Sequence, residues 1–159
     1  MNRFYLWRHK MKVFLAAPFT SKIDNGRVNK NYKQLLKDIK EILERKGCEV
    51  HLAMEKEKWG EIHCTDNDCT KRDYRDIKES EILLALFDGA FSGGVHIELG
   101  WASEMKKRII ILTNNGKNLC SLVKGLKMIT KCDILKFENK KDLNTKIKNK
   151  IEKLKNMGD

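Results

Sequence analysis

Residues 82–102 read ILLALFDGAFSGGVHIELGWA, and this stretch decides the fold. Its apolar start predicts a strand at about residues 81–88, of the kind that is buried on both faces of a parallel sheet. A loop of small residues follows, then a predicted helix at 95–107 and a further strand at 108–113. This order places the loop at the carboxyl end of a strand, where open α/β sheets bind their ligands.

The loop and the helix after it carry most of the candidate site residues. Gly93 and Gly94 let the backbone approach a ligand closely, and a helix N-terminus favours anions. Glu98 lies in about the first turn, where the helix dipole helps a carboxylate to stay ionised. Glu98 is therefore a candidate nucleophile or base, and the alternative is an acid that only caps the helix. Asp88 and His96 are candidate binding residues, although His96 could equally point to solvent.

Length and composition indicate a single domain of ordinary size. The chain has 159 residues, of which 41% are hydrophobic, and no apolar run approaches the ~20 residues of a membrane span. Residues 1–10 are basic and aromatic without the features of a secretory signal, so we expect an appendage there and one domain over 11–159. The five cysteines are scattered, which predicts reduced thiols and a cytoplasmic protein.

The net charge of +11 arises largely from lysines in the last third of the chain. Such a balance fits nucleic acid or attraction of anionic small substrates. The lysines are not interleaved with aromatic residues and form no nucleic-acid motif. A solvated helix face is the simpler interpretation, and we do not expect a nucleic-acid partner.

The remaining elements complete an alternating pattern. Apolar runs and helical periodicity predict a first strand at 12–17, a helix at 28–46, a second strand at 49–52, a short helix at 71–80, a turn at 114–116, a short helix at 119–126, a fifth strand near 128–129 or 134–135, and a final helix at 140–156. Strands alternating with helices predict a parallel sheet covered on both faces. The first loop, from Pro18, lacks the glycine patterns of dinucleotide and ATP sites, so we predict no cofactor.

Residues 53–70 are the most irregular segment and predict a long loop that covers a substrate. Trp59 is the expected aromatic cover over a base or sugar. His63, Cys64 and Cys69 suggest zinc, but their spacing matches no usual zinc motif, and we predict no metal. Phe19, in the first loop, either stacks on a ligand or packs beneath the loop.

The short predicted helix offers two acids that could work with Glu98. Asp73 could project from the helix start toward the strand ends, and Asp76, one turn later, is its rival. Either could instead be a surface carboxylate, because acidic residues favour the first turn of a helix.

Three segments together resemble the nucleoside 2-deoxyribosyltransferase superfamily. They are residues 12–19 (KVFLAAPF), Asp73 with residues 80–85 (SEILLA), and above all residues 92–102 (SGGVHIELGWA). The resemblance covers most of residues 12–113. It implies a flavodoxin-like, Rossmann-like three-layer sandwich with a sheet of five parallel strands.

The resemblance also implies an activity and roles for individual residues. The superfamily breaks the N-glycosidic bond between a base and a (deoxy)ribose, its C1′-facing carboxylate matches Glu98, and its second acid matches Asp73. In the branch that hydrolyses nucleoside 5′-monophosphates, a serine of the glycine loop holds the phosphate. Ser92 has the same spacing, although it could be no more than the helix N-cap.

We therefore expect an N-glycosidase that releases the free base from a nucleoside 5′-monophosphate or nucleoside. The physical chemistry agrees, because a carboxylate beneath C1′ stabilises the positive charge that develops there or attacks it. Base exchange between deoxynucleosides is one alternative, and a non-catalytic nucleotide sensor is another. A homodimer or higher homo-oligomer is expected from the resemblance and from the frequency of two-fold assemblies.

Overall fold

The computed structural model describes residues 10–114 and 119–157. Five parallel strands form one sheet in the order β4-β1-β5-β6-β7, which confirms the predicted flavodoxin-like architecture. The strands are β1 (Met11–Ala16), β4 (Cys48–His51), β5 (Ile82–Phe87), β6 (Arg108–Thr113) and β7 (Cys132–Lys136). A separate hairpin pairs β2 (Ile23–Asp24) with β3 (Arg27–Val28) in a region predicted to be a loop.

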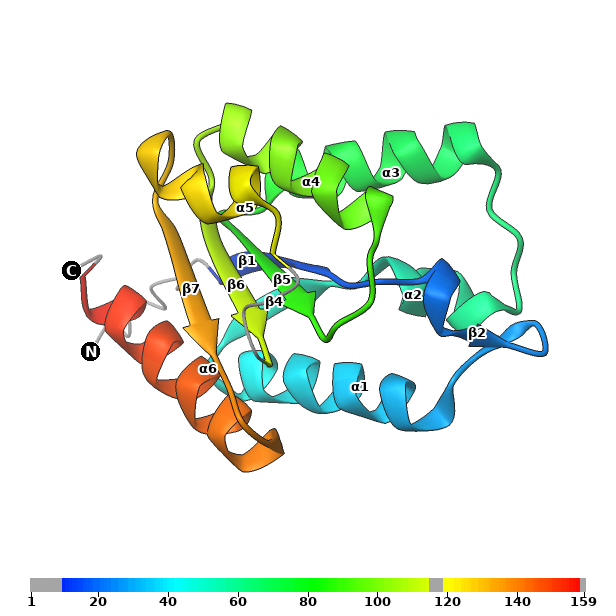
Figure 1. Cartoon of the computed structure of the whole chain (residues 1–159), viewed down its shortest axis with the longest axis horizontal. Helices are drawn as coiled ribbons and strands as arrows, with labels where there is room; N and C mark the ends of the chain where they lie inside the picture. The colour runs from blue at the N-terminus through cyan, green and yellow to red at the C-terminus, as the bar shows by residue number, and fades with distance from the viewer. Residues whose placement is uncertain (1–9, 115–118, 158–159) are drawn as a thin grey trace, which may run out of the picture.

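Helices cover both faces of the sheet (Figure 1). Helices α1 (Lys30–Arg45) and α6 (Lys140–Asn156) pack on one face. Helices α3 (Asp66–Glu79), α4 (Gly93–Glu104) and α5 (Ser121–Gly125) pack on the other. The short helix α2 (Ala53–Lys56) and three 3₁₀ turns, η1 (Thr20–Lys22), η2 (Lys58–Gly60) and η3 (Leu126–Met128), complete the elements of the described residues.

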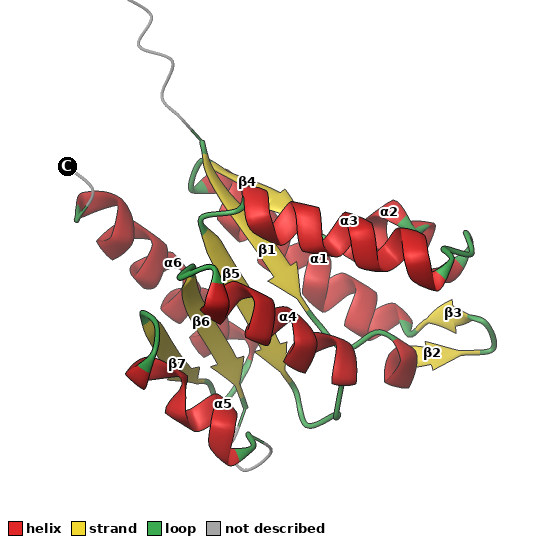
Figure 2. Ribbon diagram, turned by 90° about the horizontal axis from the view of Figure 1, so that it is seen from above, coloured by secondary structure: helices red, strands yellow, loops and turns green. Residues whose placement is uncertain are grey.

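The central strand β5 explains why the layers form as they do. All six of its residues are buried, and their side chains alternate between the two hydrophobic cores. Leu84 lies in the core beneath α1 and α6, whereas Leu83 lies in the core beneath α3 and α4. Viewed from above, the sheet strands lie side by side and the β2–β3 hairpin projects beyond them (Figure 2).

Local interactions explain where α4 begins and which of its two predicted positions the fifth strand takes. Helix α4 begins at Gly93, two residues early, because the Ser92 side chain accepts a hydrogen bond from the backbone N–H of Val95 and caps the helix. It ends at Glu104, and Lys106 follows with a positive φ of 55°. The fifth strand takes the second predicted position, around Ile134, because residues 126–128 close a 3₁₀ turn.

Residues 53–70 are more ordered than the predicted covering loop. They contain α2, η2 and the first turn of α3, which begins at Asp66 rather than Lys71. Thr65 caps that helix by accepting a hydrogen bond from the backbone N–H of Asp68. The predicted appendage lies almost wholly outside the described residues, as does most of the predicted turn at 114–116. None of the described helices has the length and apolar character needed to cross a membrane.

Candidate active site

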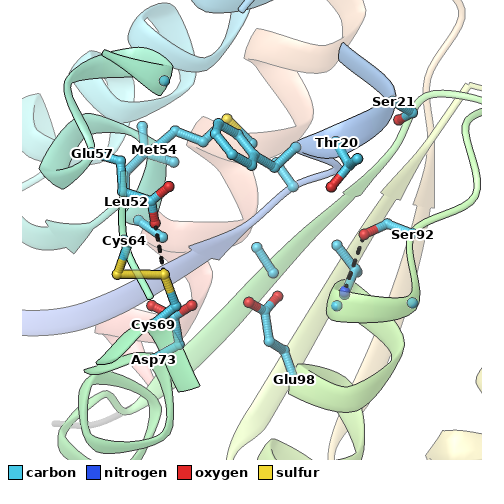
Figure 3. Close-up of a pocket in the computed structure, with 18 of the residues that line it drawn as sticks. Thr20, Ser21, Leu52, Met54, Glu57, Cys64, Cys69, Asp73, Ser92 and Glu98 are labelled. Atoms are coloured by element: carbon cyan, nitrogen blue, oxygen red, sulfur yellow. Dashed lines mark hydrogen bonds between the residues drawn. A yellow bond between two sulfur atoms is a disulfide. The ribbon is translucent and has the colours of Figure 1, made fainter. Parts of the chain in front are cut away.

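A cavity of about 550 Å³ opens at the carboxyl ends of β1 and β4, between α2, α3 and the start of α4 (Figure 3). Its volume suits a small organic ligand. The sheet order reverses between β1 and β5, so the cavity occupies the position where open α/β sheets bind ligands. Of the predicted site residues, the lining includes Phe19, Asp73, Ser92, Gly93, Gly94 and Glu98.

Glu98 lies in the second turn of α4, and its carboxylate points into the cavity (Figure 3). Burial and the nearby Asp73 carboxylate raise the pKa of Glu98 to about 8. The expectation that the helix dipole keeps this group ionised is therefore wrong, because α4 starts earlier and desolvation outweighs the dipole. In the protein without a bound ligand, the Glu98 carboxyl group is therefore largely protonated at neutral pH.

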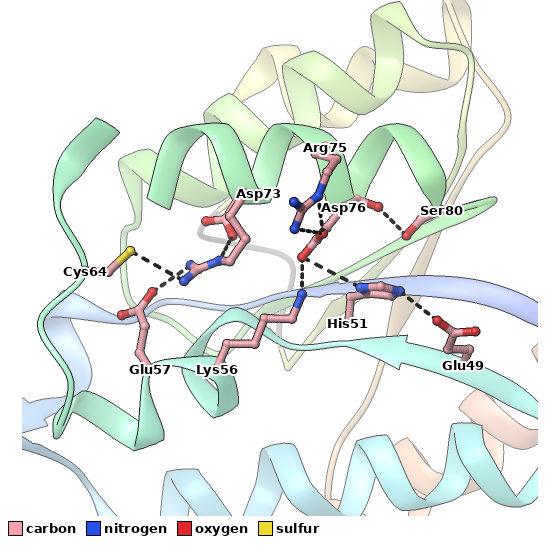
Figure 4. A network of polar contacts seen from close by, with 10 residues as sticks. Glu49, His51, Lys56, Glu57, Cys64, Asp73, Arg75, Asp76 and Ser80 are labelled. Carbon is pink, nitrogen blue, oxygen red and sulfur yellow. Dashed lines mark hydrogen bonds and ion pairs between the residues drawn. The ribbon is translucent and has the colours of Figure 1, made fainter. Parts of the chain in front are cut away.

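Asp73 projects from the middle of α3 rather than from its start, since the helix is one turn longer than predicted. Burial raises the pKa of Asp73, and the neighbouring Arg72 guanidinium counters part of that rise. Arg72 Nε donates to Asp73 Oδ1 at 2.9 Å, and Arg72 Nη2 donates to Glu57 Oε1 at 2.7 Å (Figure 4). One guanidinium thus links two carboxylates of the cavity wall.

Asp76, the rival of Asp73, belongs to a different network. It is 3% exposed and forms ion pairs with Lys56 and with Arg75, while His51 Nδ1 lies 3.7 Å from its Oδ2 (Figure 4). Although burial alone would raise it, the pKa of Asp76 is lowered by the hydrogen bond and charge of Lys56. Asp76 does not line the cavity, so Asp73 is the acid that shares the cavity with Glu98.

The glycine loop forms the end of the cavity at the N-terminus of α4. Ser92 Oγ accepts the hydrogen bond from Val95 at 3.3 Å, so Ser92 is an N-cap as well as a lining residue. A methyl group added at Gly93 would meet no other atom within 4 Å. Packing within the chain therefore does not require glycine at position 93.

Three predicted binding residues, Trp59, Asp88 and His96, lie away from this cavity. Trp59 is 9% exposed and packs in the core beneath α1, where Lys33 lies 5.1 Å from its ring centre, so it is not the expected cover. Asp88 forms a 2.5 Å ion pair with Lys22 beside a separate shallow hollow.

His96 neither lines the cavity nor points simply to solvent. Its Nδ1 lies 2.6 Å from Ser92 O, and its ring packs against Phe87 and Phe91. Phe19 lines the cavity and also packs against the core, so it meets the packing alternative, and its stacking on a ligand stays a prediction.

The cysteines also differ from the prediction. Cys64 and Cys69 are joined in a disulfide, with their Cα atoms 5.9 Å apart, and both line the cavity (Figure 3). The pairing arises because Cys69 follows the N-cap of α3 by one turn, which brings it back beside Cys64. Cys48, Cys120 and Cys132 are free.

Sequence reasoning did not identify several cavity residues. Glu57 and Arg72 could not be singled out among the many charged residues, because the charge pattern alone does not reveal ion pairs between residues far apart in the chain. Thr20 and Ser21 also line the cavity, and their place directly after the first strand was the available signal.

The family model for nucleoside 2-deoxyribosyltransferase matches residues 13–145, most of the chain. This chain belongs to that family. No match to a curated protein sequence was found.

Solved structures agree with the family assignment. The CMP N-glycosidase BcmB of Clostridium botulinum is 31% identical, with a TM-score of 0.70 over 87% of this chain and 98% of that protein. BlsM is 27% identical, with a TM-score of 0.77 over 91% of each chain. The 2-deoxyribosyltransferase of Bacillus psychrosaccharolyticus is 18% identical, with a TM-score of 0.59 over 84% of this chain and 90% of that protein, and it supports the fold alone. Membership of this family means chemistry of the deoxyribosyltransferase or N-glycosidase type on nucleosides or nucleotides.

Proposed function

We propose that this protein hydrolyses the N-glycosidic bond of a nucleoside 5′-monophosphate, with Glu98 as the carboxylate that faces C1′. The observation that carries the proposal is the convergence of Glu98 and Asp73, from two helices, on one cavity that ends at the N-terminus of α4. The 31% identity to a CMP N-glycosidase favours hydrolysis of nucleotides over base exchange.

The two carboxyl groups supply the proton states that this reaction needs. Ionised Glu98 attacks C1′ or stabilises the positive charge there, while a protonated Asp73 gives its proton to the leaving base. Both pKa values are raised, so the pair retains a proton at neutral pH; this proton lies mainly on Glu98 before substrate binds and has to be on Asp73 when Glu98 attacks. Water then releases the sugar from Glu98, with the second acid acting as base, and the products are free base and (deoxy)ribose 5-phosphate.

The glycine loop is our proposed phosphate site. Backbone N–H groups at the start of α4 and the Ser92 hydroxyl can donate to phosphate oxygens, and Thr20 and Ser21 add hydroxyl groups from the same cavity. Because a side chain at position 93 would extend into open space, a ligand that approaches the backbone is a better reason for glycine there than packing. Binding energy gathered at the phosphate would hold C1′ over Glu98.

The test is base release from nucleosides and nucleoside 5′-monophosphates, with and without a second free base as acceptor. We expect release from nucleotides without an acceptor, a loss of about 10³-fold or more in Glu98→Ala, and a raised KM with little loss of stability in Gly93→Ala. Base release that occurs only with the acceptor base would instead show that the protein transfers the sugar between bases and does not hydrolyse the bond. Nucleotide binding without base release would instead favour the sensor, and full activity in Glu98→Ala would refute the proposed role of Glu98.

A further inference from the structure

The disulfide between Cys64 and Cys69 forms part of the cavity wall beside the proposed acid. Cys69 belongs to the first turns of α3, whereas Cys64 lies before the helix in a segment outside helix and strand. Ile62 and His63, from the same segment, also line the cavity. The bond therefore ties an irregular stretch of the wall to the helix that carries Asp73.

Both sulfur atoms share polar partners with the site. Arg72 Nη1 lies 3.6 Å from Cys64 Sγ, and Cys69 Sγ lies 3.6 Å from Glu57 Oε1 (Figure 4 shows the Cys64 contact). Arg72 also donates to Glu57 and to Asp73. A change at Cys64 thus reaches the Asp73 carboxylate through Arg72, and a change at Cys69 reaches it through Glu57 and Arg72.

We propose that Cys64 and Cys69 are a reversible thiol–disulfide site at which oxidation completes the substrate cavity and reduction impairs it. The inference rests on the proposed function for its effect on catalysis, but the redox chemistry itself does not. The co-reactant is a small dithiol or disulfide, which can reach both sulfurs because both face the cavity.

The reaction balances in both directions. A thiolate of the dithiol attacks one sulfur and forms a mixed disulfide, and the other protein sulfur leaves as a thiolate. The second thiol of the reductant then displaces the remaining protein sulfur. The protein pair gains two electrons and two protons, and the reductant becomes a disulfide. In the reverse direction, the cationic Arg72 favours the thiolate that initiates reoxidation.

Reduction should weaken substrate binding rather than abolish the chemistry. Without the bond, the wall segment that carries Ile62 and His63 has to be ordered when substrate binds. We expect KM to rise about tenfold, the factor that corresponds to ordering about one residue on binding, with a smaller change in kcat.

The experiment assays the full chain after equilibration with reduced or oxidised dithiothreitol, in parallel series with and without chelator. Alkylation and intact mass count the thiols. The wild type should gain two alkylated thiols on reduction, raise its KM, and recover on oxidation. Cys64→Ser/Cys69→Ser should match the reduced wild type and ignore the reductant. Cys120→Ser, which removes an exposed free thiol, should respond as the wild type does.

Several results would overturn the proposal. They are a Cys64–Cys69 pair that stays reduced in the oxidised buffer, an equal KM in both states, and a double variant that still responds to reductant. Zinc bound by Glu57 and the reduced thiols of Cys64 and Cys69, whose ligand atoms lie within 4.8 Å of one another, would also overturn it, and in that case chelator would abolish the redox effect.

A second measurement separates this inference from the proposed function. Hydrogen exchange of peptides covering residues 61–65 needs no substrate, and reduction should accelerate it in the wild type but not in the double variant. If exchange responds and no nucleotide is cleaved, the proposed function fails and the redox site stands. If nucleotides are cleaved and exchange does not respond, the redox site fails.

Discussion

Replacing Glu98 by glutamine should make the protein more stable in alkaline solution than the wild type. The native pKa of about 8 exceeds the ordinary value of 4.5, so the native state holds a proton that the unfolded chain has lost between these values. Unfolding free energy therefore falls as the pH rises from 4.5 to 8 and is flat above. Because glutamine does not titrate, the unfolding free energy of Glu98→Gln should not fall in this way.

The size of the effect follows from the same values. A rise of 3.5 pH units, at ~1.4 kcal/mol per unit, gives an upper limit of about 5 kcal/mol. Because the carboxylate borders an open cavity, water reduces this penalty, and we expect about 2–5 kcal/mol.

The assay is urea unfolding of both proteins at pH 5 and at pH 9. The quantity of interest is the difference between the two pH changes, which removes the titrations that both proteins share. Glu104→Gln, at the exposed end of the same helix, is the matched control and should follow the wild type. If Glu98→Gln loses as much stability as the wild type on going to pH 9, then Glu98 is not held protonated and our account of the site is wrong.

Three further predictions follow from the site and the core. The reaction needs one proton on the Glu98–Asp73 pair, so the kcat/KM of the wild type should fall about tenfold per pH unit above about pH 8, where that proton is lost, and a profile that stays level up to about pH 10 would contradict this. Asp73→Asn removes both the proton donor and a charge that raises the pKa of Glu98, so the activity of the variant should be lower and should rise with pH to a plateau, with a midpoint below pH 8; a variant that keeps the fall of the wild type above pH 8 would disprove the coupling of the two groups. Trp59→Ala should cost about 3–5 kcal/mol in urea unfolding but leave KM nearly unchanged, because Trp59 lies in the core; a large rise in KM with intact stability would restore it to the site.

Much of the fold could be predicted because its signals are local. The apolar run of β5 and the periodicity of α6 each reflect the burial of one element, and both were located within about one residue. The chain also indicated Glu98, Asp73 and the loop from Ser92 to Gly94, mainly through their match to family motifs. Their placement in one cavity agrees with that prediction, and their roles remain proposals.

Other parts of the site depend on contacts between distant segments. Trp59 is an aromatic residue in an irregular segment, so it was expected to cover the ligand. Instead, η2 places its side chain in the core beneath α1, and no local sequence pattern predicts that turn. Apart from the family motif, which matches Asp73, their positions in the sequence did not distinguish Asp73 from Asp76. Only the packing of α3 against the sheet directs Asp73 to the cavity and Asp76 to Lys56.

The sequence by itself determined the order of strands and helices, the position of the glycine loop and the presence of a carboxylate shortly after it. These properties follow from residue spacing, which acts over a few residues. Only the tertiary structure decided that Glu98 and Asp73 line one cavity, that Arg72 joins Asp73 to Glu57, and that Cys64 pairs with Cys69. The protonation state of Glu98 belongs to this second group, because desolvation and a neighbouring charge act through space between elements that are remote in the chain.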